Sequence, residues 1–265
     1  MLRRNRQVKK PIIVPVDQLT QEPYASVLCF PNPSEAELQS RIQELRSLDV
    51  SALEFSGTAS LFGVAIPVLG KGFVGIVVIA HVKGKRVAVK IRRTDADRAD
   101  LLHEAHMLSK ANSVNVAPKL MAASKNFLLM RLIDGGLLPN WLKTNKESAR
   151  VKQILREVLE QCFRLDQAGL DHGELSKAPK HLLVDKTEKL FIVDFETASE
   201  ERRVANVTAV CQYLFAGNSS ASKILAEIFG ERNRLELIDS LKAYKKNKTK
   251  TTFENLLKVC FSKLV

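Results

Sequence analysis

Four residues near position 70 form a pattern that suits the binding of phosphate groups. Gly70, Gly72, Gly75 and Val77 make a GxGxxGxV run. Because glycine has no side chain, main-chain N–H groups in such a loop can approach and cover phosphate oxygens. The next strand-like run, after a lysine-glycine turn, ends in Lys90, which supplies a positive charge. The pattern therefore predicts a phosphate-binding hairpin followed by a strand that carries a lysine.

A carboxylate falls within the apolar stripe of the next expected helix. Leu101, Ala105 and Leu108 recur at helical spacing, and Glu104 lies among them. A charge on a buried face is costly unless a cation meets it, so Lys90 on the preceding strand is the expected partner. The alternative is that Glu104 lies at the edge of the stripe and is solvated.

Two acidic segments further along the chain complete the set of reactive groups. His172, Gly173 and Glu174 precede a strand-like run that begins at His181, and the next strand-like run ends in Asp194. Two short strands joined by a turn bring both carboxylates to one wall of a cleft. One carboxylate can then orient or deprotonate an attacking hydroxyl while the other holds a metal ion that bridges phosphates. The predicted chemistry is transfer of a phosphoryl group.

Hydrophobic periodicity predicts the elements that position these residues. Three antiparallel strands are expected between Leu61 and Arg93, and Thr94 with Asp97 is expected to start the helix that carries Glu104. The other expected elements are a capped helix from Ser34 to Leu48, a buried strand at 127–133 that runs into a glycine break, a long helix that Gly169 terminates, and an apolar helix at 206–215.

Composition excludes several classes of protein. The chain has 265 residues and 45% hydrophobic content, which suffices for one sizeable core or for two lobes that share a cleft. No uncharged apolar run of 18 residues is present, and the start lacks the apolar stretch of a secretory signal. The four cysteines form neither CxxC metal pairs nor a disulfide framework. We expect a soluble, cytoplasmic protein without a zinc site or membrane contact.

The formal net charge of +12 is concentrated in two clusters. Their members are Arg3, Arg4, Arg6, Lys9 and Lys10 near the start, and Lys242, Lys245, Lys246, Lys248 and Lys250 near the end. Such clusters can bind the phosphate backbone of RNA, in a ribosomal or tRNA-bound partner for example. The other interpretation is that they are solvated segments without a partner.

From about Leu61 onward, these motifs resemble small archaeal-type atypical serine/threonine protein kinases, in the style of RIO kinases and the kinase of the KEOPS complex. The run His172-Gly173-Glu174-Leu175-Ser176 is similar to the HG(D/E)LS run of that group. The resemblance implies an α+β, bilobal protein-kinase-like fold with a small antiparallel β N-lobe and a reduced helical C-lobe. It implies a helical N-terminal extension at 1–60, an N-lobe at 61–133 and a C-lobe at 134–265.

The resemblance also implies roles for single residues. Gly70, Lys71, Gly72 and Gly75 would cover the phosphates of ATP, and Val77, Ala88 and Leu183 would sandwich the adenine. Met130 would be the gatekeeper, with the backbone of Arg131 and Leu132 facing the adenine edge. Lys90 would pair with the phosphates and with Glu104, Asp194 would bind Mg²⁺ or Mn²⁺, and Glu174, Lys90 and His172 would form the catalytic group.

The chain departs from the kinase pattern at three positions. Glu174 stands where a catalytic Asp belongs, and Pro179 stands where the metal-binding Asn is expected, five residues later. His181, directly before the next strand, is the positional replacement for that Asn. Because imidazole is a poor Mg²⁺ ligand, we expect one-metal chemistry or a preference for Mn²⁺. Glu196 replaces the glycine of DFG and no Ala-Pro-Glu follows, which predicts a reduced activation segment.

The expected function is ATP-dependent phosphoryl transfer to serine or threonine, including autophosphorylation, on a protein substrate that the sequence does not identify. One alternative is a pseudokinase or ATPase-type switch associated with ribosomal or tRNA-modifying machinery. Another is a small-molecule kinase of the aminoglycoside-phosphotransferase type, although the chain lacks a long acidic, substrate-holding insertion.

Overall fold

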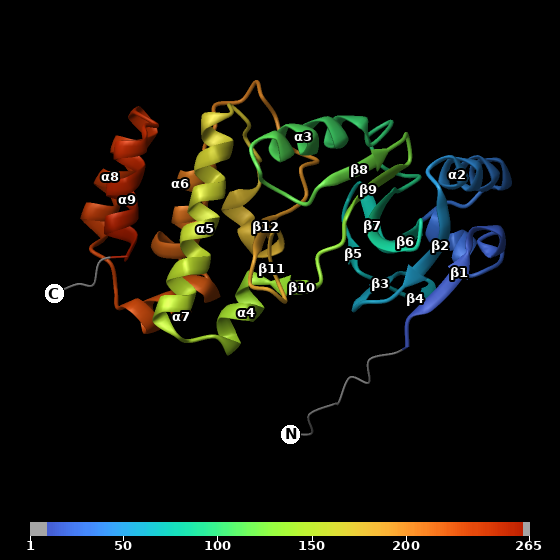
Figure 1. Cartoon of the computed structure of the whole chain (residues 1–265), viewed down its shortest axis with the longest axis horizontal. Coiled ribbons are helices and arrows are strands. Elements are labelled where there is room, and N and C mark those ends of the chain that lie inside the picture. Colours follow the sequence, from blue (N-terminus) through green and yellow to red (C-terminus); the bar gives the residue numbers. More distant parts are fainter. Residues whose placement is uncertain (1–9, 262–265) are drawn as a thin grey trace. The chain divides into compact units, whose positions relative to one another are not determined.

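The computed structural model describes residues 10–261 and divides the chain into two compact units (Figure 1). Unit 1 contains the described residues up to Ala105 together with Lys119–Leu132. Unit 2 contains His106–Pro118 and the described residues from Ile133 onward. The mixed α+β fold, with an antiparallel sheet in the N-terminal part and a helical C-terminal part, confirms the fold class expected from the sequence.

Unit 1 is built on an antiparallel sheet whose longest hairpin carries the glycine pattern and Lys90. Its strand order is β1 (Ile12–Pro15), β2 (Val50–Phe55), β6 (Gly75–Val82), β7 (Lys85–Arg92), β9 (Phe127–Arg131) and β8 (Leu120–Ala123), and β5 (Gly70–Lys71) also pairs with β6. Lys83 and Gly84 join β6 to β7 with φ values of 49° and 75°. Positive φ at both central residues is typical of the type I′ turn that closes a two-residue hairpin.

The first of the three antiparallel strands expected between Leu61 and Arg93 is present at 64–68, but it does not join this sheet. It forms β4 (Val64–Val68), which pairs only with β3 (Ala59–Leu61) among the described strands. The second edge of β6 is already occupied, by β2 at Ile79–Val82 and by β5 at Ile76–Val77. Residues 12–55 supply β1 and β2, so the N-terminal extension expected from the sequence contributes strands to the sheet of unit 1.

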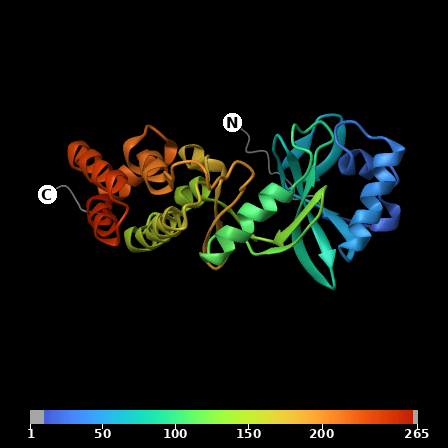
Figure 2. The same cartoon turned by 90° about the horizontal axis from the view of Figure 1, so that it is seen from above.

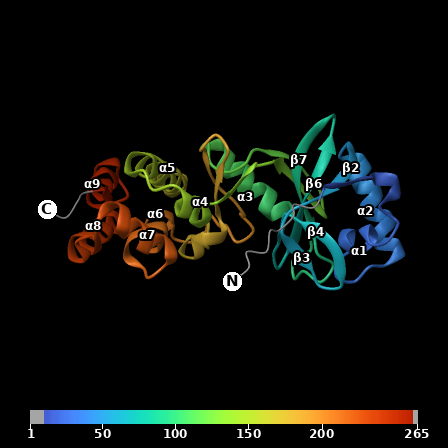
Figure 3. The same cartoon turned by 90° about the horizontal axis from the view of Figure 1, so that it is seen from below.

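Helices α1 (Tyr24–Leu28) and α2 (Glu35–Ser47) lie together on one side of this sheet (Figure 3). The side chain of Ser34 accepts a hydrogen bond from the N–H of Glu37, which confirms the predicted helix start. Leu38, Ile42 and Leu45 of α2 are buried. They belong to one core with alternate residues of the sheet, including Val78, Val89 and Leu129.

The helix that carries Glu104, α3 (Leu102–Ser113), starts later than Thr94 and Asp97 had indicated. Asp100 provides the acceptor for its first turn, since its carboxylate accepts from the N–H of Leu102. Thr94 is occupied elsewhere, because its hydroxyl donates to the carbonyl of Cys29 and its N–H donates to the carbonyl of Phe30. Its side chain therefore ties the region after β7 to the α1–α2 connection.

Unit 2 contains a small antiparallel sheet in the order β10 (Gly135–Leu137), β11 (Leu182–Asp185) and β12 (Leu190–Ile192). The hairpin of β11 and β12 was predicted from the sequence. The break expected after the buried strand lies at 132–134, between β9 and β10, and Gly135 itself already pairs with Asp185 in a strand. A side chain on Gly135 would overlap the carbonyl of Val184, so glycine is required there by close approach of the two backbones.

Helices make up the rest of unit 2 and cluster in Figures 2 and 3. They are α4 (Leu138–Thr144), α5 (Ser148–Gln167), α6 (Asn206–Cys211), α7 (Ser220–Phe229), α8 (Arg234–Lys246) and α9 (Lys250–Phe261), and a π-helical turn at Gln212–Ala216 extends α6. The long helix α5 ends just before Gly169, whose φ of 70° confirms the predicted terminator. Among residues 10–261, no helix is both long enough and apolar enough to span a membrane.

Candidate functional site

The glycine pattern forms a tight turn between β5 and β6. The N–H of Gly72 donates to the carbonyl of Gly75 at 2.8 Å. A Cβ on Gly75 would lie 2.8 Å from Cγ of Lys90 and 2.9 Å from the carbonyl oxygen of Ile91, whereas one on Gly72 would meet only the Gly75 carbonyl, at 3.6 Å. Neither glycine has a positive φ. Glycine is therefore needed at position 75 for close approach to the lysine rather than for an unusual backbone conformation.

The turn is tied to the N-terminal part of unit 1 through Arg93, a contact that the sequence did not predict. The N–H of Arg93 donates to the carbonyl of Val74 at 2.8 Å, and its guanidinium donates to the carbonyl of Gly72 at 3.3 Å. Asp95 pairs with the guanidinium at 2.6 Å. Lys71 and Arg93 also lie over the ring of Phe30, 5.0 and 5.2 Å from its centroid. Cation–π contacts of this kind fix the orientation of both basic side chains.

Lys90 and Glu104 form the ion pair that the apolar stripe predicted. Nζ of Lys90 lies 2.7 Å from Oε2 of Glu104, and each side chain is 6% exposed. Burial makes each charge dependent on the other, because an unpaired charge in such a position is strongly unfavourable. The solvated alternative for Glu104 is therefore wrong.

The residues expected to contact adenine in unit 1 share a sheet face with Lys90. Val77 is opposite Lys90 in the β6–β7 register, and Ala88 is opposite Met130 in the β7–β9 register. Because side chains alternate along a strand, these residues project from the face opposite the α1–α2 core. The N–H of Arg131 donates to the carbonyl of Lys119 at 2.9 Å, so it is not available to a base. The backbone of Leu132 follows β9 directly.

In unit 2, His172 holds the loop around Glu174 rather than facing solvent. Its side chain is fully buried, and Nε2 lies 3.1 Å from the carbonyl of Val193, so Nε2 is the donor. Its ring packs edge-to-face on Phe195 at 4.8 Å. Burial, together with the neighbouring His181, lowers the pKa of His172 to about 4. His172 is therefore neutral near pH 7, and these surroundings suit a positioning residue better than a proton carrier.

A buried polar chain beneath this loop was missed at the sequence level. Asn206 accepts from the N–H of His172 at 2.9 Å and donates its side-chain N–H to Asp166 at 2.8 Å, and the hydroxyl of Tyr244 also donates to Asp166 at 2.8 Å. Burial raises the pKa of Asp166, although these hydrogen bonds oppose the rise. The available signal was an acid beside the apolar stripe of α5, the same kind of signal that identified Glu104.

The segment after Asp194 is short and folds back on the loop before Glu174. Asp171 and Ser199 exchange backbone hydrogen bonds of 2.9 and 2.8 Å, and Arg202 pairs with the Asp171 carboxylate at 3.0 Å. Gly173 has a φ of 87°, and a side chain there would overlap the guanidinium of Arg202. The reduced activation segment expected from the sequence thus corresponds to a compact turn.

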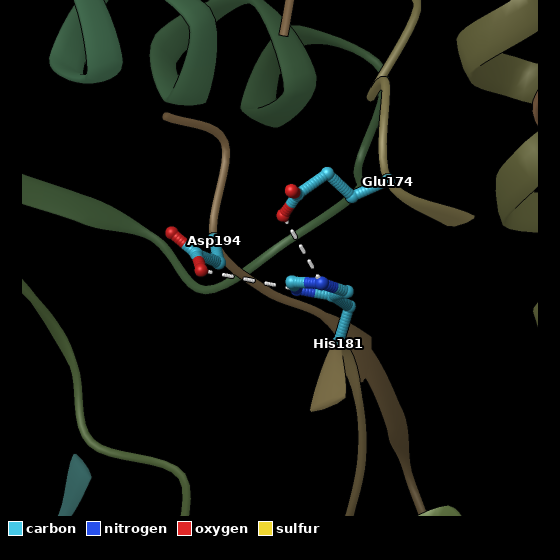
Figure 4. A group of neighbouring side chains, drawn as sticks. All are labelled: Glu174, His181 and Asp194. Atoms are coloured by element: carbon cyan, nitrogen blue, oxygen red, sulfur yellow. Dashed lines mark ion pairs between the residues drawn. The ribbon is translucent and has the colours of Figure 1, made fainter. Parts of the chain in front are cut away.

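Glu174, His181 and Asp194 meet in unit 2 (Figure 4). Nε2 of His181 lies 3.3 Å from Oε2 of Glu174, and Nδ1 lies 3.9 Å from Oδ2 of Asp194. The His181 side chain is 5% exposed, whereas Glu174 and Asp194 are 32% and 36% exposed. Asp194 has a φ of 71°, an uncommon conformation that directs it away from the line of β12. One ligand atom from each residue lies within 4.8 Å of the others.

This donor set fits a divalent metal ion. Two carboxylates and an imidazole are common ligands, and Nδ1 of His181 is buried without a hydrogen-bond partner. A buried polar atom of this kind normally has a partner, so a ligand at this place would satisfy it. Leu183, the adenine residue expected from unit 2, is half-buried on β11 between Leu137 and Phe191.

Comparisons with known proteins agree with the motif order. The family model described as protein tyrosine and serine/threonine kinase matches residues 65–210, more than half of the chain. An uncharacterized protein of Methanocaldococcus jannaschii, MJ1211, is 29% identical over 99 residues, which cover 37% of this chain and 81% of that protein. The rat proto-oncogene tyrosine-protein kinase ROS is 25% identical over 129 residues, which cover 43% of this chain but only 5% of ROS. The match to more than half of its length shows that the chain belongs to the protein tyrosine and serine/threonine kinase family.

Proposed function

We propose that the chain is an atypical serine/threonine kinase, in the style of the RIO and KEOPS kinases, that transfers the γ-phosphoryl group of ATP to a protein hydroxyl, including its own. The observation that carries the proposal is the buried Lys90–Glu104 pair, in which the Lys90 side chain lies directly against Gly75. Kinases of this family use such a pair to aim the lysine at the α- and β-phosphates.

Unit 1 would bind the nucleotide. The backbone of Gly70, Lys71, Gly72 and Gly75 would cover the phosphates, and the sheet face that bears Val77, Ala88 and Met130 is apolar enough to receive a base. The backbone N–H that donates to the adenine edge would be that of Leu132 rather than that of Arg131, which already donates to Lys119. In this proposal the N-lobe comprises residues 61–133, to which the extension at 1–60 adds strands and helices.

The C-lobe, residues 134–265, would supply the acidic groups and, with Leu183, an adenine contact. Asp194 would hold Mg²⁺ or Mn²⁺ with His181, and the metal would neutralise charge on the β- and γ-phosphates. Glu174 would orient the substrate hydroxyl and accept its proton. The hydroxyl oxygen then bonds to the γ-phosphorus as the bond to the β–γ bridging oxygen breaks, and ADP leaves with its electron pair. Because the segment after Asp194 is short, a partner protein would present the substrate.

Incubation with γ-labelled ATP tests the proposal. The wild type should label itself or an added protein, whereas Lys90→Met and Asp194→Asn should each lower the labelling at least 100-fold while their circular dichroism is unchanged. Lys85→Met provides a matched control, because Lys85 is exposed at the start of the same strand. Release of free phosphate without labelled protein, or equal labelling in all variants, would contradict the proposal.

A nucleotide switch that docks on a ribonucleoprotein is the second candidate, and the surface of α8 and α9 favours it. Lys245, Lys246 and Lys250 are exposed there, as is Lys242, which pairs with Asp239. Arg3, Arg4, Arg6 and Lys9 of the other basic cluster lie outside the described residues. Replacing Lys245 and Lys246 by Glu should lower the affinity for structured RNA and make it less sensitive to salt. An unchanged affinity would remove this support.

A further inference from the structure

His181 lies between two carboxylates, each of which faces a different nitrogen of its ring (Figure 4). Glu174 lies on the Nε2 side and Asp194 on the Nδ1 side. The ring is held from behind by His172, whose ring packs edge-to-face against it with centroids 5.3 Å apart. The backbone of His181 is fixed as well, because its N–H donates to Ala178 and its carbonyl accepts from the N–H of Val193. The imidazole therefore has little freedom to turn.

The two contacts are unequal, and the difference favours one tautomer of the ring. An ionised carboxylate only accepts hydrogen bonds, so the shorter contact, 3.3 Å to Glu174, favours the proton on Nε2. Nδ1 then presents a lone pair toward the Asp194 carboxylate, 3.9 Å away. Nδ1 is also buried and has no hydrogen-bond partner. A cation between the buried Nδ1 lone pair and the partly exposed carboxylate would satisfy the nitrogen and stabilise both groups.

We propose that Nδ1 of His181 and the Asp194 carboxylate bind a first-row transition-metal ion without nucleotide, and that Glu174 positions His181 by accepting a hydrogen bond from Nε2–H. The inference deepens the proposed phosphotransfer site and rests on it for the assignment of Asp194 to the metal. A carboxylate that holds the remote N–H of a ligating histidine fixes the tautomer and raises the basicity of the ligand. This contact uses one oxygen of Glu174, so the second oxygen can still orient a hydroxyl.

Distance and donor type support this assignment. Two ligand atoms at about 2.1 Å from one ion are at most about 4.2 Å apart, so the 3.9 Å separation is within reach. Mg²⁺ prefers oxygen ligands and keeps several waters, whereas Mn²⁺ and Co²⁺ accept imidazole, Co²⁺ more tightly. The exposed fractions of Glu174 and Asp194 leave room for water or phosphate oxygens to complete the coordination.

Titration of the full chain with Co²⁺ alone, after removal of metal by a chelator, tests the site directly. The wild type should develop the visible absorption of Co²⁺ with a nitrogen ligand and bind Co²⁺ and Mn²⁺ at least 10-fold more tightly than Mg²⁺. His181→Asn puts an amide oxygen in place of the ring and should abolish most of this preference. Glu201→Gln is the matched control, because Glu201 is an exposed acid of unit 2 away from the three residues, and its titration should equal that of the wild type.

Glu174 variants separate positioning from direct ligation. Glu174→Leu should weaken Co²⁺ binding by about 10- to 100-fold, as loss of a partner behind a metal ligand does. Glu174→Gln keeps an acceptor oxygen and should restore most of the affinity. Nitrogen-detected histidine spectra of the metal-free protein should show the Nε2–H tautomer of His181 in the wild type and in Glu174→Gln, and a mixture in Glu174→Leu.

Several outcomes would overturn the inference: absence of Co²⁺ binding, equal binding by His181→Asn, or an Nδ1–H tautomer in the wild type. Equal loss in Glu174→Gln and Glu174→Leu would make Glu174 a ligand instead. The outcome of the labelling assay is independent of these metal-binding results. Co²⁺ binding without phosphoryl transfer refutes the proposed function and keeps the site, whereas transfer in Mg²⁺ without a nitrogen-bound Co²⁺ spectrum refutes the site and keeps the function.

Discussion

Two groups of charged residues differ in how their charges are balanced: the Lys90–Glu104 pair of unit 1 and the Glu174–His181–Asp194 group of unit 2. The pair joins opposite charges at 2.7 Å, each 6% exposed. The group places two partly exposed acids around one buried histidine, whose Nδ1 has no hydrogen bond. The Lys90–Glu104 pair therefore matches its two charges, whereas the buried Nδ1 of His181 is left without a hydrogen-bond partner. The difference supports the proposal that His181 and Asp194 bind a cation.

Breaking the complete pair should have the largest effect. Glu104→Ala leaves the Lys90 ammonium buried without its carboxylate, and removing one partner of a buried pair costs about 3–5 kcal/mol. Urea unfolding followed by circular dichroism measures the loss. The double variant Lys90→Met/Glu104→Leu should recover most of the stability, because it removes both charges. If Glu104→Ala cost less than about 1 kcal/mol, the pair would be solvated and the contrast with unit 2 would fail.

A smaller effect is expected from filling the space above Lys90. Gly75→Ala puts a Cβ within 3 Å of the lysine side chain and the Ile91 carbonyl, and such overpacking typically costs about 1–3 kcal/mol. It should also weaken ATP binding, measured by calorimetry, because Lys90 must shift. Gly72→Ala is the matched control, since its Cβ would meet only one atom, at 3.6 Å. Equal effects of the two substitutions would show that Lys90 is not confined by Gly75.

Sequence patterns located the groups but not the contacts that hold them. Glu104 was identified because a charge in an apolar stripe requires a partner, and periodicity placed α2, α5 and the β11–β12 hairpin correctly. The strand at 64–68 was assigned to the wrong sheet because strand pairing depends on which edges are free. That property follows from tertiary structure. The free edge of β6 pairs with β2, which begins more than 20 residues before β6.

The missed contacts all join residues far apart in the chain. Arg93 reaches Phe30, and Asn206 links His172 to Asp166. Arg93, Phe30 and Asn206 lie in no local motif, so spacing offered no signal for their contacts. Among these residues, Asp166 carried a signal as an acid beside the apolar stripe of α5. His181 was identified by its place before β11, but its geometry between two acids depends on the 3₁₀ turn at Leu175–Lys180 and on the left-handed φ of Asp194. A repeating pattern does not encode such turns.

Opposite pH responses should distinguish a buried acid with cationic partners from one with neutral donors. Burial opposes ionisation of Glu54 in unit 1, but hydrogen bonds from Arg86 and His81 outweigh it and lower its pKa. Its stabilising contribution is present above the unfolded pKa, about 4.3, and is lost as the pH falls through the folded value. Burial raises the pKa of Asp166 in unit 2, so its contribution decreases as the pH rises from about 3.9 through the folded value.

Unfolding free energies of Glu54→Gln and Asp166→Asn between pH 3 and 7 measure these responses. The advantage of the wild type over Glu54→Gln should shrink on acidification. The stability of Asp166→Asn relative to the wild type should instead improve as the pH rises. Parallel curves for the wild type and both variants would mean that neither acid changes its proton affinity on folding.

The smallest effect is expected where the N-terminal part of unit 1 contacts the glycine turn. Arg93→Ala removes the hydrogen bond to the Gly72 carbonyl and the contact with Phe30, and Phe30→Leu removes the ring while it keeps an apolar side chain. A cation–π contact contributes about 0.5–2 kcal/mol, so Arg93→Ala should reduce stability less than Glu104→Ala. The turn should become less ordered, however, and hydrogen exchange at Gly72 to Val74 should accelerate in Arg93→Ala but remain slow at Val89 in the core. Faster exchange at both places would mean that Arg93 supports the sheet as a whole rather than the turn. A matching loss of ATP affinity would show that the proposed nucleotide-binding turn depends on the N-terminal part of unit 1 for its position.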